Sequence, residues 1–171
     1  MSRPFVPVHL AILTVSDTRT LAEDASGDAL VERATSAGHQ IVERALLRDD
    51  LSAIVGQLRA WIDEPRVDVI LTTGGTGVTG RDVMPEAFAE VSEKDIPGFG
   101  ELFRWLSYAS IGTSMIQSRA GACVSGGTYL FMLPGSTSAC REAWDGILAS
   151  QLDVRHRPCN LVELMPRLQE R

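Results

Sequence analysis

Cysteine is scarce in this sequence, and its placement excludes two kinds of site. The chain has three cysteines, Cys123, Cys140 and Cys159, which lie far apart and belong to no CxxC or Cys/His motif. A disulfide-stapled domain would carry a denser, even-numbered set, and a structural zinc site would bring its ligands closer in sequence. We therefore expect reduced thiols that fill the core of a cytoplasmic protein.

Positive charge and long apolar runs are also limited. Sixteen Lys and Arg residues stand against 22 Asp and Glu residues, which gives a formal net charge of −6. A general nucleic-acid binder or a protein bound to an anionic membrane would need a basic surface. No segment approaches the roughly 18 consecutive apolar residues of a membrane span, and residues 1–15 do not lead into a signal-peptide cleavage site. We expect no nucleic-acid and no membrane partner, although backbone amides could still hold a small anionic ligand.

The length of 171 residues fits a single domain that spans residues 1–171. A chain of this size buries about 70% of its unfolded surface, so neither a metal nor a disulfide is required for folding. The patterned core runs from about residue 8 to residue 153. Residues 154–171 carry little pattern, and we expect them to form a peripheral tail that packs on a neighbouring subunit.

Short apolar runs alternate with segments of helical periodicity along the chain. The apolar runs predict strands at residues 9–15, 40–47, 67–72, 120–124 and 128–133. Helices are predicted to begin at Ser26-Gly27, after a cap at Asp50, at Pro85-Glu86, behind Pro97-Gly98 and at Pro134–Thr137. Because Ser125-Gly-Gly127 leaves room for only a tight turn, the last two strands should form a hairpin or lie as antiparallel neighbours. The alternation predicts an α/β fold with a largely parallel sheet flanked by helices.

Three loops leave predicted strand ends with a composition suited to an anion. They are Ser16-Asp17, Thr73–Gly77 with Arg81-Asp82 behind it, and Pro134–Thr137. In an open α/β sheet, ligands bind beyond the carboxyl ends of the strands. Glycines there let backbone amides approach a phosphate, and hydroxyls add donors. We therefore predict that the three loops form one anion site, with plain turn geometry as the alternative.

Other kinds of site receive less support. The stretch Gly75–Gly80 satisfies GxGxxG, but it follows the third strand and its helix is delayed to Pro85, which disfavours a nicotinamide-dependent oxidoreductase. A Walker P-loop is excluded because the sequence has no Gly-Lys-Ser/Thr. The histidines fall outside the three loops and are expected to be structural. The tryptophans lie on apolar helix faces, which predicts core packing for Trp61, Trp105 and Trp144.

Two aspartates follow the second and third predicted strands. Asp49 and Asp82 could merely cap helices. Beside phosphate-binding glycines, they could instead hold Mg²⁺ through one or two carboxylates together with substrate oxygens. The residues alone leave both interpretations open.

Eight motifs occur in a specific order over about residues 10–150. They are Thr14–Asp17, Glu23–Gly27, Leu71–Gly77, Arg81–Val83, Pro85–Ala87, Ile96–Glu101, Ser118-Arg119 and Leu133–Gly135. This ordered set resembles the MoaB/Mog family of molybdenum cofactor biosynthesis. The stretches Gln117–Arg119, Pro134–Thr137 and Arg157–Asn160 look most like the B branch of that family.

The resemblance implies a three-layer α/β/α fold that binds molybdopterin and forms homotrimers or homohexamers. Active members transfer AMP from ATP to the molybdopterin phosphate with Mg²⁺ and release pyrophosphate. A phosphate monoester with a second pKa of about 6 is already mostly ionised, so no general base is needed. Alignment and charge neutralisation are the tasks left to the protein. Further partners would be other proteins of the same pathway.

The family motifs, matched residue by residue, also imply roles within the site. Asp49 and Asp82 match the acidic positions tied to metal binding and catalysis. The ligand positions are Ser16 and Asp17 in the first loop, Gly74, Gly75, Thr76 and Gly77 in the nucleotide loop with Glu86 in the helix after it, Ser114, Ser118 and Arg119 on the pterin and phosphate side, and Pro134, Gly135 and Ser136 in the last loop. Thr137 stands where the adenylyltransferase branch usually has proline. The alternative hypothesis is therefore a non-catalytic molybdopterin-binding or assembly protein of the same pathway.

Overall fold

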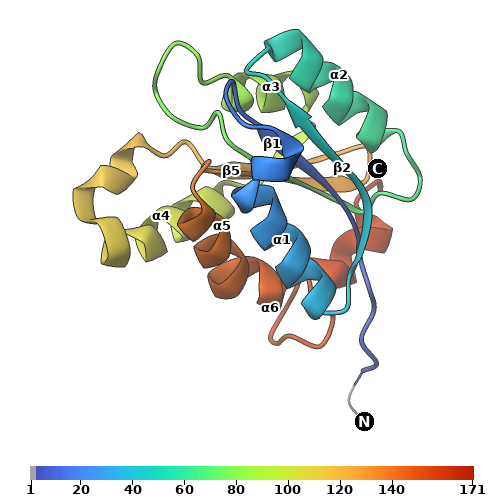
Figure 1. Ribbon diagram of the computed structural model, residues 1–171. Coiled ribbons are helices and arrows are strands. Elements are labelled where there is room, and N and C mark those ends of the chain that lie inside the picture. The colour runs from blue at the N-terminus through green and yellow to red at the C-terminus, as the bar shows by residue number, and fades with distance from the viewer. Residues whose placement is uncertain (1–2) are drawn as a thin grey trace.

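A six-stranded sheet forms the centre of the molecule, with the strand order β2-β1-β3-β6-β5-β4 (Figure 1). The computed structural model describes residues 3–171, so the first two residues of the expected domain lie outside it. The strands are β1 (His9–Val15), β2 (Gln40–Leu47), β3 (Val69–Thr73), β4 (Lys94–Asp95), β5 (Gly121–Ser125) and β6 (Thr128–Leu133). Strands β2, β1, β3 and β6 are mutually parallel, whereas β5 and β4 pair antiparallel at one edge. The sheet is mostly parallel, as predicted.

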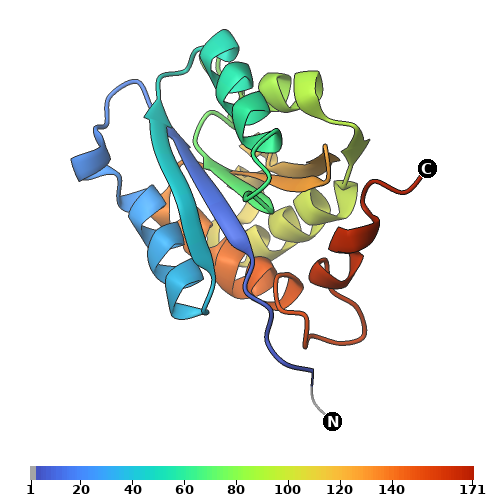
Figure 2. The same cartoon turned by 90° about the vertical axis from the view of Figure 1, so that its right-hand side faces the viewer.

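Helices cover both faces of this sheet. They are α1 (Ala25–Ser36), α2 (Leu51–Ile62), α3 (Met84–Val91), α4 (Pro97–Ile111), α5 (Thr137–Ala143) and α6 (Ala149–Gln151). Figure 2 shows α2 and α3 on one face and α1, α4 and α5 on the other. A π-helical turn, Trp144–Leu148, joins α5 to α6, and 3₁₀ turns occupy Leu21–Glu23, Gly112–Gln117 and Val162–Arg167. The result is the three-layer α/β/α arrangement that the family resemblance implies.

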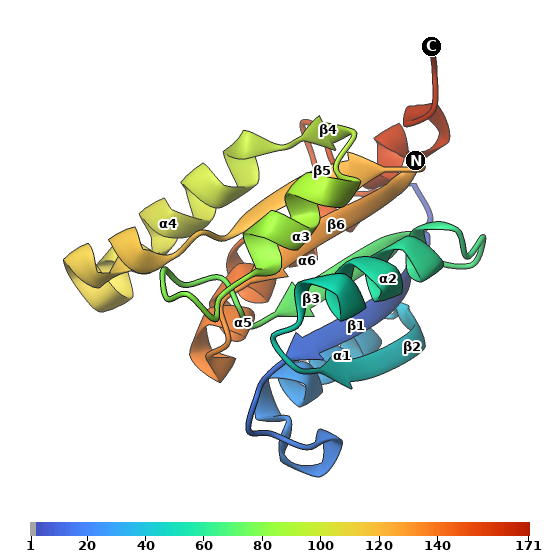
Figure 3. The ribbon, with the colours of Figure 1, turned by 90° about the horizontal axis from the view of Figure 1, so that it is seen from above.

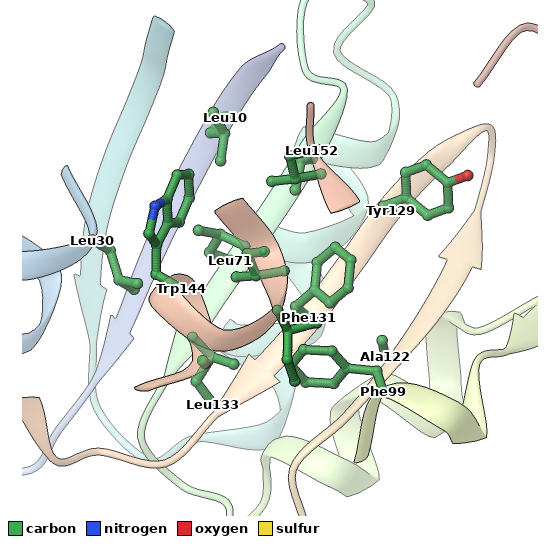
Figure 4. Packing of buried hydrophobic residues seen from close by; sticks show 14 of the residues in the cluster. Leu10, Leu30, Leu71, Phe99, Ala122, Tyr129, Phe131, Leu133, Trp144 and Leu152 are labelled. Carbon is green, nitrogen blue, oxygen red and sulfur yellow. The ribbon is translucent and has the colours of Figure 1, made fainter. Parts of the chain in front are cut away.

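Two apolar clusters, one on each face, hold the layers together. Side chains alternate along β1, so Leu10 and Ile12 join one cluster while Ala11 and Leu13 join the other. Figure 4 shows the first cluster, in which the ring of Phe131 packs edge-on against the ring of Phe99 from α4. A strand that helices cover on both faces has apolar side chains on both faces. The central strands are therefore recognisable in the sequence as nearly continuous apolar runs.

Several local predictions are confirmed. Strands β1, β2 and β6 have the predicted bounds, and β5 and β6 form the predicted hairpin. The Asp50 carboxylate caps α2 by accepting a hydrogen bond from the backbone N–H of Ala53 at 2.8 Å. The third strand begins at Val69 instead of residue 67, because Val67 still belongs to the turn that follows α2, where its N–H donates to the Glu64 carbonyl.

Three predictions about burial are wrong. Trp105 is 72% exposed, although Trp61 and Trp144 lie in the core as expected. Cys159 is exposed, whereas the other two cysteines are buried. The segment after Leu152 is not peripheral, since it packs on the sheet of its own chain: Val162 is buried and the Leu161 carbonyl accepts a hydrogen bond from the Tyr129 hydroxyl at 2.9 Å.

The connections place a crevice at one edge of the sheet. The chain leaves β1 toward α1 on one face and leaves β3 toward α3 on the opposite face. Where adjacent parallel strands feed opposite faces, their loops separate and a ligand can enter between them. Within residues 3–171, no helix is long and apolar enough to cross a membrane.

Candidate functional site

A cavity of about 580 Å³ lies at the carboxyl edge of the sheet. Its lining comes from the loops after β1, β2, β3 and β6, from α4 and α5, and from the 3₁₀ turn Gly112–Gln117. Figure 3 shows these segments at one end of the molecule, away from the two chain termini. Segments that are distant in sequence therefore meet in one hollow.

The structure brings most of the predicted site residues together. The members found in the cavity wall are Ser16, Asp17, Asp49, Gly74, Gly75, Thr76, Gly77, Asp82, Ser114, Ser118, Pro134, Gly135 and Ser136. Glu86 and Arg119 lie outside it, in a smaller neighbouring hollow that shares Asp82. The positions thus converge as the anion-site prediction requires, while their individual roles toward a ligand stay predictions.

Arg119 braces the glycine-rich loop from outside. Its guanidinium donates to the Gly77 carbonyl at 2.8 Å, to the Asp82 carbonyl at 3.1 Å and to the Glu86 carboxylate at 2.6 Å. Its own backbone N–H donates to the carbonyl of Thr76 at 2.9 Å. The hydrogen bond from Arg119 lowers the pKa of Glu86 and so favours its ionised form. In this arrangement Arg119 and Glu86 fix the shape of the loop that lines the cavity.

Glycine is required where two of the loops touch. Gly74 has a φ of +99°, and a Cβ there would lie 2.1 Å from the Val15 carbonyl oxygen. Its N–H donates to the Leu133 carbonyl at 3.0 Å, which ties the end of β3 to the end of β6. A Cβ on Gly135 would approach the Gly74 Cα to 3.4 Å. A side chain at Gly74 would push these backbones apart, whereas one at Gly135 would meet Gly74 only at ordinary contact distance, so the close approach depends on Gly74.

Three carboxylates gather at the polar end of the cavity. Asp17 forms a bidentate ion pair with Arg81, in which the guanidinium donates to both carboxylate oxygens at distances from 2.8 to 3.0 Å. This hydrogen-bonded partner lowers the pKa of Asp17. Asp82 uses one oxygen to accept from the backbone and hydroxyl of Thr79, at 3.0 and 2.7 Å. Asp17 and Asp82 therefore already have partners within the protein.

The third carboxylate, Asp49, is different. Its Oδ1 atom is buried and makes no hydrogen bond with any of the described residues. Burial raises the pKa of Asp49, and the negative charges of Asp17 and Asp82 raise it further, against the opposing charge of Arg81. A buried acceptor without a partner is costly, so this oxygen is available to a group that enters the cavity. Within residues 3–171, no three Asp, Glu, His or Cys side chains are grouped closely enough to hold a metal by themselves.

Two further charged residues of the cavity wall are not predicted from the sequence. Arg19 lines the wall and donates to the Gly135 carbonyl at 3.4 Å and to the Ser26 hydroxyl at 3.2 Å, so it places positive charge beside the last loop. Glu142 lines the far wall, where α5 meets α4. The available signals were weak: Arg19 is two residues beyond Asp17 in the first loop, and Glu142 is one helical turn beyond Ser138 on the same face of α5.

A comparison with protein-family models matches residues 11–154 to a family described as a probable molybdopterin binding domain. The matched range contains every residue predicted for the site. It stops short of the segment that carries Asn160 and Val162.

Similar proteins carry related names. The chain is 49% identical to molybdenum cofactor biosynthesis protein B of Escherichia coli K12 over 160 residues, which cover 94% of each chain. It is 44% identical to the protein of the same name from Staphylococcus carnosus over 149 residues, covering 85% of this chain and 87% of the other. A crystal structure of molybdenum cofactor biosynthesis protein B superposes with a TM-score of 0.88 at 36% identity and covers 99% of this chain and 100% of the other.

Proposed function

The chain belongs to the molybdopterin-binding family of molybdenum cofactor biosynthesis proteins, and we propose that it transfers AMP from ATP to the phosphate of molybdopterin. The observation that carries the proposal is the buried Oδ1 atom of Asp49, which has no hydrogen-bond partner within residues 3–171 and lies in a cavity walled by glycine-rich loops. In the reaction, a molybdopterin phosphate oxygen attacks the α-phosphorus of ATP. The bond from that phosphorus to the bridging oxygen breaks, and pyrophosphate leaves.

The side chains in the cavity suit a reaction without a base. No histidine or cysteine is among the described residues that line it. A phosphate monoester has a second pKa of about 6, so molybdopterin would arrive already ionised at neutral pH. Holding two polyanions in line for attack is then the main contribution to the rate.

The acidic end of the cavity fits a divalent cation. Mg²⁺ usually binds through one or two carboxylates and completes its shell with water and substrate phosphates. Asp49 Oδ1 offers a free acceptor, and Asp82 has one oxygen that accepts no hydrogen bond within residues 3–171. When bound, Mg²⁺ would neutralise phosphate charge. The same cation would remove the repulsion that raises the pKa of Asp49.

Phosphate oxygens need hydrogen-bond donors, and the loops around the cavity supply them. The backbone from Gly74 to Gly77 lines the cavity, and Ser16 and Ser136 add hydroxyls. Arg19 supplies a positive charge beside Gly135. We propose that Arg19, rather than Arg119, contacts phosphate. The guanidinium of Arg119 already donates hydrogen bonds to protein groups on the outer side of the loop.

We also propose that the protein acts as a homotrimer or homohexamer. Five large apolar side chains on α4 and the turn after it are exposed: Leu102 at 41%, Trp105 at 72%, Tyr108 at 60%, Ile111 at 54% and Ile116 at 77%. A monomer seldom leaves such a group of side chains facing water. A second copy of the chain is the occupant that the family resemblance implies.

The function is tested by incubating the purified protein with molybdopterin, ATP and Mg²⁺ and measuring adenylyl-molybdopterin and pyrophosphate. We expect Asp49→Asn to slow product formation about 100-fold or more, since it removes charge from the reaction centre. Asp82→Asn should also slow it, and unchanged turnover would remove the role assigned to that residue. Asp63→Asn, an exposed change at the opposite end of α2, should have no effect.

The same assay decides between the two functions that the family allows. Molybdopterin binding without pyrophosphate release, under conditions in which an active relative works, would replace catalysis by the carrier or assembly hypothesis. Absence of molybdopterin binding would overturn both.

A further inference from the structure

The far wall of the cavity combines a carboxylate with an apolar surface. Phe103, Ser107 and Ile111 lie one turn apart on the same face of α4, and all three line the cavity together with Met115 and Glu142. Phe103 is 1% exposed, whereas Ile111 is 54% exposed at the mouth. This wall differs from the loop end, which is built from backbone, hydroxyls and charges.

Glu142 is held in place by hydroxyls of α4. The Ser107 hydroxyl donates to its Oε2 atom at 2.6 Å. The Ser110 hydroxyl lies 3.2 Å from Oε1, but its single proton is shared with the Ser107 carbonyl at 3.0 Å. Ser107 is 3% exposed, so this support is inside the protein. The carboxylate is therefore fixed from behind.

The same contacts leave acceptor capacity on Glu142. An ionised carboxylate offers about four lone-pair positions over its two oxygens. Within residues 3–171, no lysine, arginine or histidine pairs with Glu142. Both oxygens can therefore accept from a ligand in the cavity, side by side and with charge assistance.

We infer that Glu142 recognises the 2-amino and N3–H edge of the pterin ring, an inference that rests on the proposed function. A pterin presents these two donors next to each other, in the spacing that the two oxygens of one carboxylate accept. Adenine presents an amino donor beside a ring-nitrogen acceptor, and that lone pair would face a carboxylate oxygen. Glu142 thus directs the pterin to this wall and the adenine of ATP away from it.

The placement of Glu142 suits a ligand that also carries a phosphate. Glu142 is six residues beyond Ser136, which at 1.5 Å per residue puts it about 9 Å along the helix from the last loop. In molybdopterin the phosphate and the amino edge lie at opposite ends of a fused ring system. The ring would then cross the apolar surface of Ile111 and Met115, with its phosphate at Gly135 and Ser136.

The test compares two phosphorylated ring systems, a pterin phosphate and the matching lumazine phosphate, in which the 2-amino group is replaced by an oxo group. We expect the unmodified protein to bind the pterin about 10- to 100-fold more tightly, because the lumazine oxygen opposes the carboxylate. Glu142→Gln offers one acceptor and one donor, which match lumazine. It should lower pterin affinity by about the same factor and reverse the preference.

Glu101→Gln, an exposed carboxylate on α4 outside this cavity, is the matched control and should leave both affinities unchanged. ATP affinity should be unchanged in Glu142→Gln. If the unmodified protein shows no preference for the pterin, or if Glu142→Gln keeps that preference, the assignment of Glu142 is wrong even when adenylyl transfer proceeds. If the unmodified protein prefers the pterin but transfers no AMP, the proposed reaction is wrong and the assignment of Glu142 stands.

Discussion

The Asp24 carboxylate joins three elements beside the cavity. It caps α1 by accepting from the Gly27 N–H at 2.9 Å, and it accepts from the Thr14 hydroxyl of β1 at 2.6 Å and from Arg44 of β2 at 2.9 Å. The side chain is fully buried. Burial alone would raise the pKa of Asp24, but the hydrogen bonds from Thr14, Arg44 and Gly27 outweigh it and lower the pKa.

Replacing this carboxylate should be costly. We expect Asp24→Asn to reduce the free energy of unfolding by about 3 kcal/mol, because it leaves Arg44 half-buried without its inner partner and sets an amide donor against other donors. Asp28→Asn removes the exposed partner of the same arginine and should cost less than about 1 kcal/mol. Urea denaturation of both variants measures the difference. Equal losses would show that the buried carboxylate has no special role.

Single residues also mark the limit of what sequence could predict about the site. The glycines and aspartates that follow strand ends are predictable site residues, because conformational freedom and negative charge at those positions are typical of ligand-binding loops. Glu142 was missed because its importance depends on Ser107, a residue 35 positions away on another helix. No local pattern encodes that contact.

At the scale of elements, α4 has two functional faces. One carries Phe99 and Phe103 into the core and Ser107 toward the cavity, while the opposite face exposes Leu102, Trp105 and Tyr108. The apolar spacing of this helix predicts core packing for Trp105, because hydrophobic periodicity alone cannot tell which apolar side chains stay exposed in the folded chain.

The exposed face leads to a prediction about assembly. We expect the double variant Trp105→Asp, Ile116→Asp to reduce the mass in solution to that of a single 18.5 kDa chain, because charges would be buried at the contact between copies. Leu164→Asp, at a side chain 45% exposed on the C-terminal segment, should leave the mass unchanged. Light scattering after size-exclusion chromatography gives the masses. A monomeric unmodified protein would contradict the proposed trimer or hexamer.

Elements with strong periodicity were predictable, and short irregular ones were not. Strands β1 and β6 are mostly apolar, and β2 has apolar residues on both sides of Glu43 and Arg44, so their bounds are predictable. The two-residue strand β4 and the 3₁₀ turn Gly112–Gln117 have no period that a pattern can reveal. The 3₁₀ turn contributes Ser114 and Met115 to the cavity wall, and Ser118 follows directly after it. This part of the wall therefore has no periodic pattern that could predict it.

At the scale of the whole molecule, a buried histidine links stability to pH. His39 is 5% exposed between the rings of Phe5 and Trp144, and its Nδ1 accepts the Val8 N–H at 3.2 Å. Burial lowers the pKa of His39, and the charge of Asp153 opposes this only partly. Below a pH of about 6.5 the unfolded chain therefore binds a proton at this position more readily than the folded one.

The sign of the effect follows from that difference. The contribution of His39 to stability is complete above about pH 6.5 and decreases as the pH falls through that value toward the lower pKa of the folded state. We expect the unfolding free energy to fall between pH 7.5 and 5.5, and His39→Gln to flatten this dependence, as measured by urea denaturation. His156→Gln should retain it. An unchanged slope in His39→Gln would assign the dependence elsewhere.

The C-terminal segment shows why whole-molecule packing was the hardest feature to predict. Asn160 is 2% exposed and donates to the carbonyls of Val154 and His156, both at 3.1 Å. These hydrogen bonds fold an unpatterned segment into a compact unit against the amino-terminal edge of the sheet. Polar side chains that bond to backbone carbonyls replace the periodic apolar signal on which sequence analysis depends.

Both terminal segments lie at this amino-terminal edge, opposite the cavity. Arg3 forms an ion pair with Glu163, and Gln169 donates to the carbonyl of Gly126 in the turn that precedes β6. A biosensor chip or a fluorescent reporter attached through either segment would therefore stand at the back of the protein. Small molecules could still diffuse freely into the mouth, and their arrival could be recorded without an obstructing tether.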